Sequence, residues 1–187
     1  MGLDITAYRN ARPARPEIQS VINTAEEPRE VAYNLGVQIP WINDNFPGRE
    51  EGITPGVAYE TDKETICAGL SYGGYNAWRE ALAQMVGIAN IREWFRNPDM
   101  SVPFSELLNF ADNEGVLGPV VCKRIAADFD VWSARAAEYT PRTLEAGYFR
   151  SHYSTWHAAF KHAACDGFVE YGRVRWRATL ASATIRA

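Results

Sequence analysis

The sequence predicts an α+β domain in which a mostly antiparallel sheet, beginning at the N-terminus, is packed by about three helices. Residues 3–8 alternate between apolar and polar side chains, and such alternation returns after residue 167. Between them, from residue 71 onward, apolar residues recur every three or four positions, as in helices. Because the 187 residues are 47% hydrophobic and 22% charged, we expect one globular domain over 1–187, with 172–187 as an extra strand or tail.

The first half of the chain is expected to be mostly β. Residues 3–8 form a strand, and residues 11–30, rich in proline and charge, form a loop. Residues 31–42 have strand-like composition and precede a turn-rich surface loop, NDNFPGREEG, at 43–52. Residues 56–70 predict a hairpin, because two β-prone runs bracket a polar centre.

The second half is expected to be mostly α. A helix over 71–87 ends at a glycine, and a helical turn is expected around 106–110. A second long helix begins at Pro119, and a third is capped by Thr140 and Pro141 and ends at Asp166 and Gly167. Residues 168–180 then add an edge strand to the sheet. The apolar stripes of the three helices are Tyr75, Trp78, Leu82 and Met85; Val121, Ile125, Phe129, Trp132 and Ala136; and Phe149, Tyr153, Trp156, Phe160 and Ala164.

Charge, cysteine spacing and hydropathy exclude several classes of protein. A net charge of -4 argues against non-specific binding to nucleic acid or acidic membrane, because no excess of cations is present. Cys67, Cys122 and Cys165 are too widely and irregularly spaced for a metal pair or redox couple, which indicates a reduced cytoplasmic protein. No apolar run approaches the roughly 20 residues of a membrane span, and the N-terminal residues MGLDITAYRN lack the pattern of a signal peptide, so we expect neither secretion nor membrane insertion.

Motifs for metal binding and nucleophilic catalysis are absent from the sequence. His152, His157 and His162 follow one another at five-residue steps, which turns each about 140° from the last on a helix. They therefore cannot converge on one ion, and we expect neither a metal nor a cofactor. There is no GxSxG, HExxH, P-loop or zinc-finger spacing, although a triad assembled from distant residues stays open.

The segment SYGGYNAWR, residues 71–79, is the strongest candidate for a ligand site. Gly73 and Gly74 would let a ligand approach the amides of a helix N-terminus, which attract anions. Tyr72 and Tyr75 could stack on a flat ring, and Arg79 could pair with a phosphate. The alternative is that the glycines form only a tight turn, Tyr75 is a core residue and Arg79 is solvated.

Two further polar clusters and one basic stretch complete the candidates. Asn109, Asp112 and Glu114 lie in LNFADNEGVLGP, which lacks the EF-hand spacing, so helix capping is the alternative to ligand binding. Arg49 lies in the 43–52 loop and could contribute to the ligand site; the alternative interpretation of this loop is a solvated turn without a ligand. Arg173, Arg175 and Arg177 alternate with apolar residues; Trp176 falls on the opposite face, which favours a protected sheet edge over a nucleic-acid platform.

Taken together, FPGR, YNAWR and NFADNEG, with MGLDITAYRN and WHAAFKHAACDGFVEY, give the chain a family resemblance. Over residues 1 to about 171 it resembles a family of small, uncharacterised bacteriophage and prophage proteins; the 172–187 tail departs from that pattern. The resemblance implies a phage origin and action in the cytoplasm of the host cell. Small phage accessory proteins often antagonise host defence, by sequestering a nucleotide-derived signal or by binding a defence protein.

Three functions remain open on this basis. The leading hypothesis is a protein that binds and sequesters a small phosphorylated nucleotide-type ligand, because arginines are paired with aromatic and amide groups. The second is a protein–protein inhibitor of a host defence component. The third is a nucleotide-acting enzyme with Asp112 or Glu114 as general base and His157 as acid. The ligand site predicted for the leading hypothesis comprises Arg49, Tyr72, Gly73, Gly74, Tyr75, Arg79, Asn109, Asp112 and Glu114.

Overall fold

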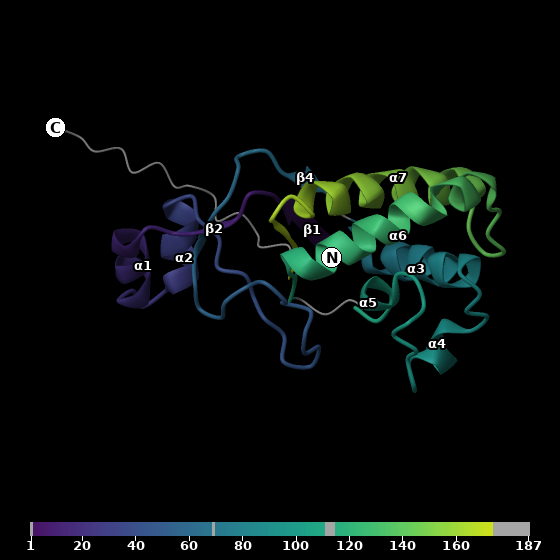
Figure 1. Cartoon of the computed structure of the whole chain (residues 1–187), viewed down its shortest axis with the longest axis horizontal. Helices are drawn as coiled ribbons and strands as arrows, with labels where there is room; N and C mark the ends of the chain where they lie inside the picture. The colour runs from purple at the N-terminus through teal and green to yellow at the C-terminus, as the bar shows by residue number, and fades with distance from the viewer. Residues whose placement is uncertain (1, 69, 111–114, 174–187) are drawn as a thin grey trace.

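An antiparallel sheet packed by helices forms the body of the protein, which confirms the predicted α+β class (Figure 1). The computed structural model describes residues 2–68, 70–110 and 115–173. The sheet has the strand order β4 (Ile66–Cys67), β1 (Gly2–Tyr8), β7 (Phe168–Arg173), β6 (Gly115–Leu117), and β5 (Leu70–Ser71) also pairs with β1. The sheet therefore joins both ends of the described chain.

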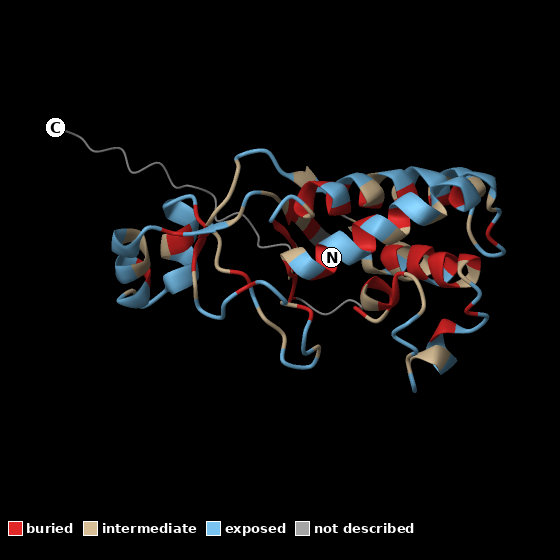
Figure 2. Ribbon diagram, in the orientation of Figure 1, coloured by how far each residue is buried: buried red, intermediate tan, exposed pale blue. Residues whose placement is uncertain are grey.

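Three long helices cover this sheet and carry the predicted stripes into the core. They are α3 (Tyr72–Met85), α6 (Pro119–Glu138) and α7 (Ala146–Ala163), and α7 contacts α3, α6 and the strands β1, β4 and β7. Their facing sides are buried and their outer sides exposed (Figure 2). Among the residues that the structure describes, no helix is long and apolar enough to cross a membrane. The largest fully buried side chains include Trp78, Trp156, Tyr75, Tyr171, Phe104, Phe110, Phe129, Phe149 and Phe160.

The strand that follows α7 lies inside the sheet, so its predicted edge position is wrong. β7 is hydrogen-bonded to β1 on one side and to β6 on the other. Phe168, Val169 and Tyr171 are all buried, as expected of a central strand covered on both faces. Before it, Gly167 approaches β1 so closely that a Cβ there would lie 1.9 Å from the Tyr8 carbonyl oxygen. Arg175 and Arg177 lie outside the described residues.

Two short helices replace the loop predicted over residues 11–30. They are α1 (Pro16–Asn23) and α2 (Pro28–Asn34), and each begins with a proline, which needs no amide hydrogen at that position. The strand predicted at 31–42 is not formed: residues 31–34 are the end of α2, and Gln38 pairs with Tyr59 only as an isolated bridge. A small apolar cluster holds this part together; it comprises Ala14, Ile22, Ala32, Val37 and Ala58.

The predicted hairpin at 56–70 is also wrong, because its two halves pair with different partners. β3 (Tyr59–Glu60) pairs with β2 (Arg12–Pro13), whereas β4 pairs with β1. The polar centre of the segment is held elsewhere: Arg9 Nε and Asn10 Nδ2 donate to Asp62 Oδ2 at 2.7 and 3.0 Å. These bonds fasten it to the end of β1.

The helix boundaries follow most of the predicted signals. α3 is followed by Gly87, which has a φ of 97°, and α6 begins at Pro119 as predicted. α7 begins at Ala146 with Glu145 as its N-cap, so Thr140 and Pro141 do not cap it. Pro141 is instead buried in the connection that precedes this helix. The short helices α4 (Ile91–Trp94) and α5 (Ser105–Leu108) lie between α3 and β6.

Candidate functional site

The three segments that hold the predicted site residues each contribute a contact around Phe110. The Phe46 ring from the 43–52 loop lies edge-on to the Phe110 ring, with centroids 5.2 Å apart. The Tyr75 hydroxyl donates to the Phe110 carbonyl oxygen at 2.9 Å. A Cβ on Gly115 would lie 2.9 Å from the Phe110 ring and 3.2 Å from Asn43 Cβ. Asp112 and Glu114, which the sequence analysis named as site residues, lie outside the described residues.

Tyr75 is a core residue, as the structural alternative predicts. Its ring is fully buried and stacks on Trp156, with centroids 5.4 Å apart. Because the hydroxyl is also bonded to the Phe110 carbonyl, the ring is fixed at both ends. Tyr75 therefore has no free face to offer a ligand ring, although the Arg79 guanidinium lies against it.

Arg79 is buried rather than solvated, and part of its guanidinium lacks a partner. Only 5% of the residue is exposed, and its Nη2 donates to Asn76 Oδ1 at 2.9 Å. The guanidinium carbon lies 5.4 Å from the Tyr75 ring centroid and 5.1 Å from that of Phe95. Its Nε and Nη1 are buried and find no hydrogen-bond acceptor in the part of the chain that the structure describes. Native proteins seldom leave such donors unsatisfied unless a water or ion is bound there.

Of the two glycines at the start of α3, only Gly74 has a packing explanation. Ser71 Oγ accepts from the Gly74 amide at 3.0 Å and so caps the first turn of the helix. A Cβ on Gly74 would lie 2.9 Å from the Tyr148 hydroxyl of α7, whereas Gly73 faces open space. Tyr72 is half-buried against the core. The predicted anion site at this helix N-terminus thus has one of its amides already occupied.

The 43–52 loop, which contains Arg49, is fastened to the start of α6 by its backbone. The Gly118 amide donates to the Arg49 carbonyl at 2.7 Å, and the Val120 amide donates to that of Glu51 at 3.3 Å. A Cβ on Gly118 would lie 2.4 Å from the Glu51 carbonyl oxygen. Only glycine permits this approach, so backbone carbonyls occupy the amides that could otherwise have held an anion.

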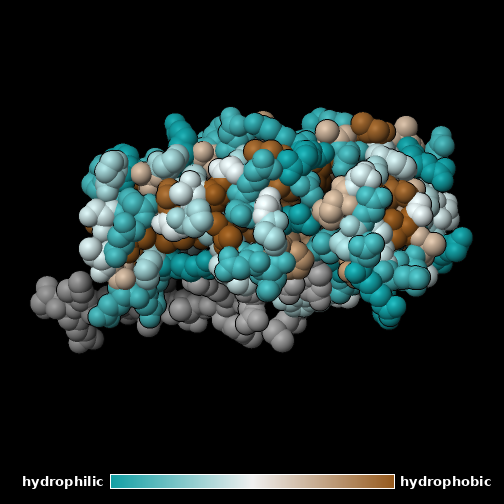
Figure 3. All heavy atoms as spheres, turned by 60° about the horizontal axis from the view of Figure 1, so that its bottom comes forward, coloured by the Kyte–Doolittle hydropathy of each residue, from teal (hydrophilic) through white to brown (hydrophobic). Residues whose placement is uncertain are grey.

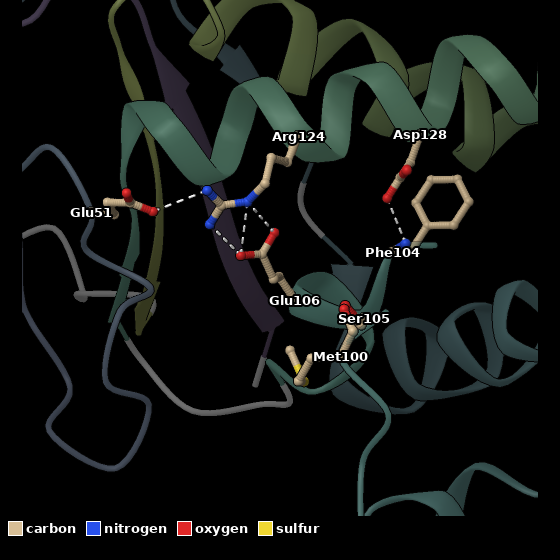
Figure 4. Close-up of polar contacts among 7 residues, drawn as sticks. All are labelled: Glu51, Met100, Phe104, Ser105, Glu106, Arg124 and Asp128. Carbon is tan, nitrogen blue, oxygen red and sulfur yellow. Dashed lines mark hydrogen bonds and ion pairs between the residues drawn. The ribbon is translucent and has the colours of Figure 1, made fainter. Parts of the chain in front are cut away.

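The Arg49 side chain lies beside a charged network rather than beside Arg79. Arg124 of α6 is bonded through its Nε and Nη2 to Glu106 of α5, and its Nη1 donates to Glu51 at 3.0 Å (Figure 4). Arg49 is 9% exposed, and its buried Nε has no acceptor among the described residues. Burial lowers the pKa of Arg49; the Glu106 charge opposes this shift and Arg124 reinforces it.

Asp128 is a polar residue at this junction that the sequence analysis did not single out. Its Oδ2 accepts from the Phe104 amide at 2.7 Å, one turn along α6 from Arg124 (Figure 4). Burial raises the pKa of Asp128, the Phe104 amide opposes the rise, and the Glu106 charge adds to it. Asn109, a predicted site residue, is the C-cap of α5 and is half-buried. The only sequence signal that could have singled out Asp128 is its position beside the apolar stripe of α6; in other respects it looks like a solvated helix carboxylate.

The proposed catalytic histidine belongs to a surface pair on α6 and α7. His157 Nε2 lies 2.7 Å from Asp130 Oδ1, and Lys161 Nζ lies 3.4 Å from the same oxygen. The bond with His157, and the weaker one with Lys161, lower the pKa of Asp130. Within residues 2–68, 70–110 and 115–173, no group of three or more His, Cys, Asp or Glu side chains could hold a metal ion.

Sequence reasoning missed Phe95, the C-cap of α4, which lies against Arg79, and the neighbouring Trp94, the last residue of α4. Phe95 covers Arg79, and the Trp94 indole Nε1 is a further buried donor for which the described chain offers no acceptor. The sequence signal that could have found them is the pair of adjacent aromatic residues inside IREWFR, a segment without a helical stripe of apolar residues.

A separate surface hollow of about 370 Å³ is lined by Asn10, Ala11, Arg12, Asp62 and Asp166.

Comparison with protein-family models, curated proteins and solved structures yields no match for this chain. The functional argument therefore starts from the geometry around Arg79.

Proposed function

We propose that this protein binds a small phosphorylated, nucleotide-type ligand and that Arg79 holds the anionic group. The observation that carries the proposal is the pair of buried N–H donors on Arg79, for which no acceptor is found among the described residues. A guanidinium presents its donors in a planar fork that matches the oxygens of phosphate. A phosphate at this point would supply an acceptor to one of these two donors, in a fork shared with Nη2, and would neutralise a buried charge.

Energetics favour a ligand over an empty site. An unpartnered buried donor costs about 1–3 kcal/mol, and more when it belongs to a charged group. Each charge-assisted bond to a phosphate contributes about 1.5–3 kcal/mol, so two such bonds with ring contacts are compatible with micromolar capture. Because the two donor atoms are buried, the ligand has to displace a neighbouring side chain to reach them.

Binding is better supported than turnover. His157, the residue proposed as the acid, is paired with Asp130, and the proposed bases, Asp112 and Glu114, lie outside the described residues. A binder without catalysis acts by sequestration, which agrees with the counter-defence role that the phage resemblance implies. In that role the protein would lower the free concentration of a nucleotide-derived signal in the host cytoplasm.

A thermal-shift screen tests the proposal directly. The wild-type protein is heated with inorganic phosphate and with linear and cyclic nucleotides, including ADP-ribose derivatives. A ligand at 100 times its Kd stabilises the folded state by about 2.7 kcal/mol, which for this chain length raises Tm by roughly 5–10 °C. If folded protein shows no shift with any of these compounds, the proposal is refuted.

A pair of variants assigns the binding to Arg79. Arg79→Met removes the buried guanidinium and should weaken binding by about 10²- to 10⁴-fold, which corresponds to two charge-assisted bonds. Arg92→Met removes the same charge from an exposed position on α4 and should leave Kd within about threefold. Isothermal titration calorimetry gives both values. Equal losses in the two variants would indicate a general charge effect instead of a site.

A protein partner is the second candidate function, and exposed apolar side chains on α1 and α2 favour it. Val21, Tyr33 and Leu35 are exposed, Tyr33 by 74%. In the view of Figure 3, hydrophobic side chains show between hydrophilic ones at the end of the molecule that holds these helices. If one host protein binds stoichiometrically, and Tyr33→Ser abolishes that binding whereas Arg79→Met does not, this second function replaces the first.

A further inference from the structure

The two rings that flank the Arg79 guanidinium differ in their freedom to move. Tyr75, on the inner side, is fully buried, stacked on Trp156 and bonded through its hydroxyl to the Phe110 carbonyl. Phe95, on the other side, is only half-buried. It is the C-cap of the four-residue helix α4, and its one close ring neighbour among the described residues is Trp94, at 5.9 Å.

Access to Arg79 therefore runs past Phe95. A ligand cannot displace Tyr75 without opening the aromatic core, because its ring also lies 6.1 Å from Tyr171 and 6.5 Å from Trp78. Phe95 can rotate toward solvent at a much smaller loss of packing. The adjacent Trp94 also has a buried indole N–H for which the described residues offer no acceptor.

We infer that Phe95 selects the ligand by stacking on a flat aromatic base attached to the phosphate that Arg79 binds. This inference rests on the proposed function and names its ligand class: nucleoside phosphates, as opposed to inorganic phosphate or sugar phosphates. When the phosphate accepts from Arg79, the base takes the exposed side of the guanidinium, where Phe95 now lies.

Stacking gives the discrimination, because every base has an aromatic face and a sugar phosphate has none. One base stacked on one aromatic side chain is worth roughly a 5- to 150-fold change in affinity. The phosphate contact with Arg79 is common to both kinds of ligand. Loss of the Phe95 ring should therefore change the ratio of the two affinities while leaving the affinity for the sugar phosphate nearly constant.

The experiment measures Kd for adenosine monophosphate and for ribose 5-phosphate by calorimetry, with four forms of the full chain. Wild type and Phe95→Tyr, which keeps the ring, should bind the nucleotide at least tenfold more tightly than the sugar phosphate. Phe95→Leu should reduce that ratio to below about threefold. Tyr33→Leu removes an exposed aromatic ring from α2 and serves as the control, with the wild-type ratio expected.

The possible results separate the two proposals. If wild type binds neither ligand and the thermal-shift screen finds no other nucleotide that binds, the proposed function fails and this inference fails with it; a nucleotide that the screen does find replaces adenosine monophosphate in this experiment. If wild type binds both equally, or if Phe95→Leu keeps the full preference, the inference is overturned while phosphate binding at Arg79 stands. A circular dichroism spectrum identical to that of wild type establishes that Phe95→Leu is folded. If it is not, Phe95→Met supplies a second variant without the ring, for which the same reduced ratio is expected.

Discussion

Replacing Arg79 by methionine separates a functional arginine from a structural one through its effect on stability without ligand. The variant loses the bond to Asn76, which is worth about 1.5–3 kcal/mol, and two cation–π contacts of about 0.5–2 kcal/mol each. It also removes two buried donors without acceptors among the described residues, each of which costs about 1–3 kcal/mol. These gains and losses nearly cancel, so the free energy of unfolding should stay within about 1.5 kcal/mol of wild type.

Urea unfolding followed by tryptophan fluorescence measures this difference. With an m-value of about 2 kcal/mol/M, the midpoint should shift by less than about 0.8 M. Arg92→Met provides the matched control, because it removes an exposed arginine from the neighbouring helix. A buried residue held for structure alone would cost about 2–5 kcal/mol on truncation. A loss of more than 3 kcal/mol in Arg79→Met would therefore show that Arg79 is structural and would remove the main support for ligand binding.

Three other predictions concern the frame around the site. Gly167→Ala should lower the free energy of unfolding by more than 3 kcal/mol, because its Cβ would lie 1.9 Å from the Tyr8 carbonyl oxygen. Chemical denaturation measures this loss, and a change below about 1 kcal/mol would contradict the prediction. Arg124→Met should lower the free energy of unfolding by about 1–3 kcal/mol, since it leaves the largely buried Glu106 carboxylate without its bidentate partner. A double-mutant cycle with Glu106→Gln should give a coupling energy above about 0.5 kcal/mol, and additive effects would argue against the network. Because the pKa of Asp128 is raised from 3.8 in the folded state, the folded protein takes up this proton before the unfolded chain does; stability from this group is present below pH 3.8 and lost as pH rises through the folded pKa. Asp128→Asn should therefore steepen the loss of stability on acidification, as measured by thermal melts between pH 3 and 6, and unchanged slopes would refute this assignment.

The long helices and the first strand were predictable from the sequence because their signals are local. A stripe repeated over the 14, 20 and 18 residues of α3, α6 and α7 specifies which face of each helix is buried. Pro119 and Gly87 mark helix ends through their own backbone preferences. The choice of Arg79 as a candidate ligand residue also came from its local pattern, a guanidinium among tyrosines and glycines.

Strand partners, the two N-terminal helices and the surroundings of the site were decided by the tertiary structure. β7 carries alternating residues near its end yet lies between β1 and β6, because pairing depends on distant segments and leaves no mark in the strand itself. Phe95, which lies against the Arg79 guanidinium, is 16 positions later in the chain, and the charges of Glu106 and Arg124 act on Arg49 only once α5 and α6 are folded. Contacts between residues far apart in the chain follow from packing the whole core, which no local period encodes.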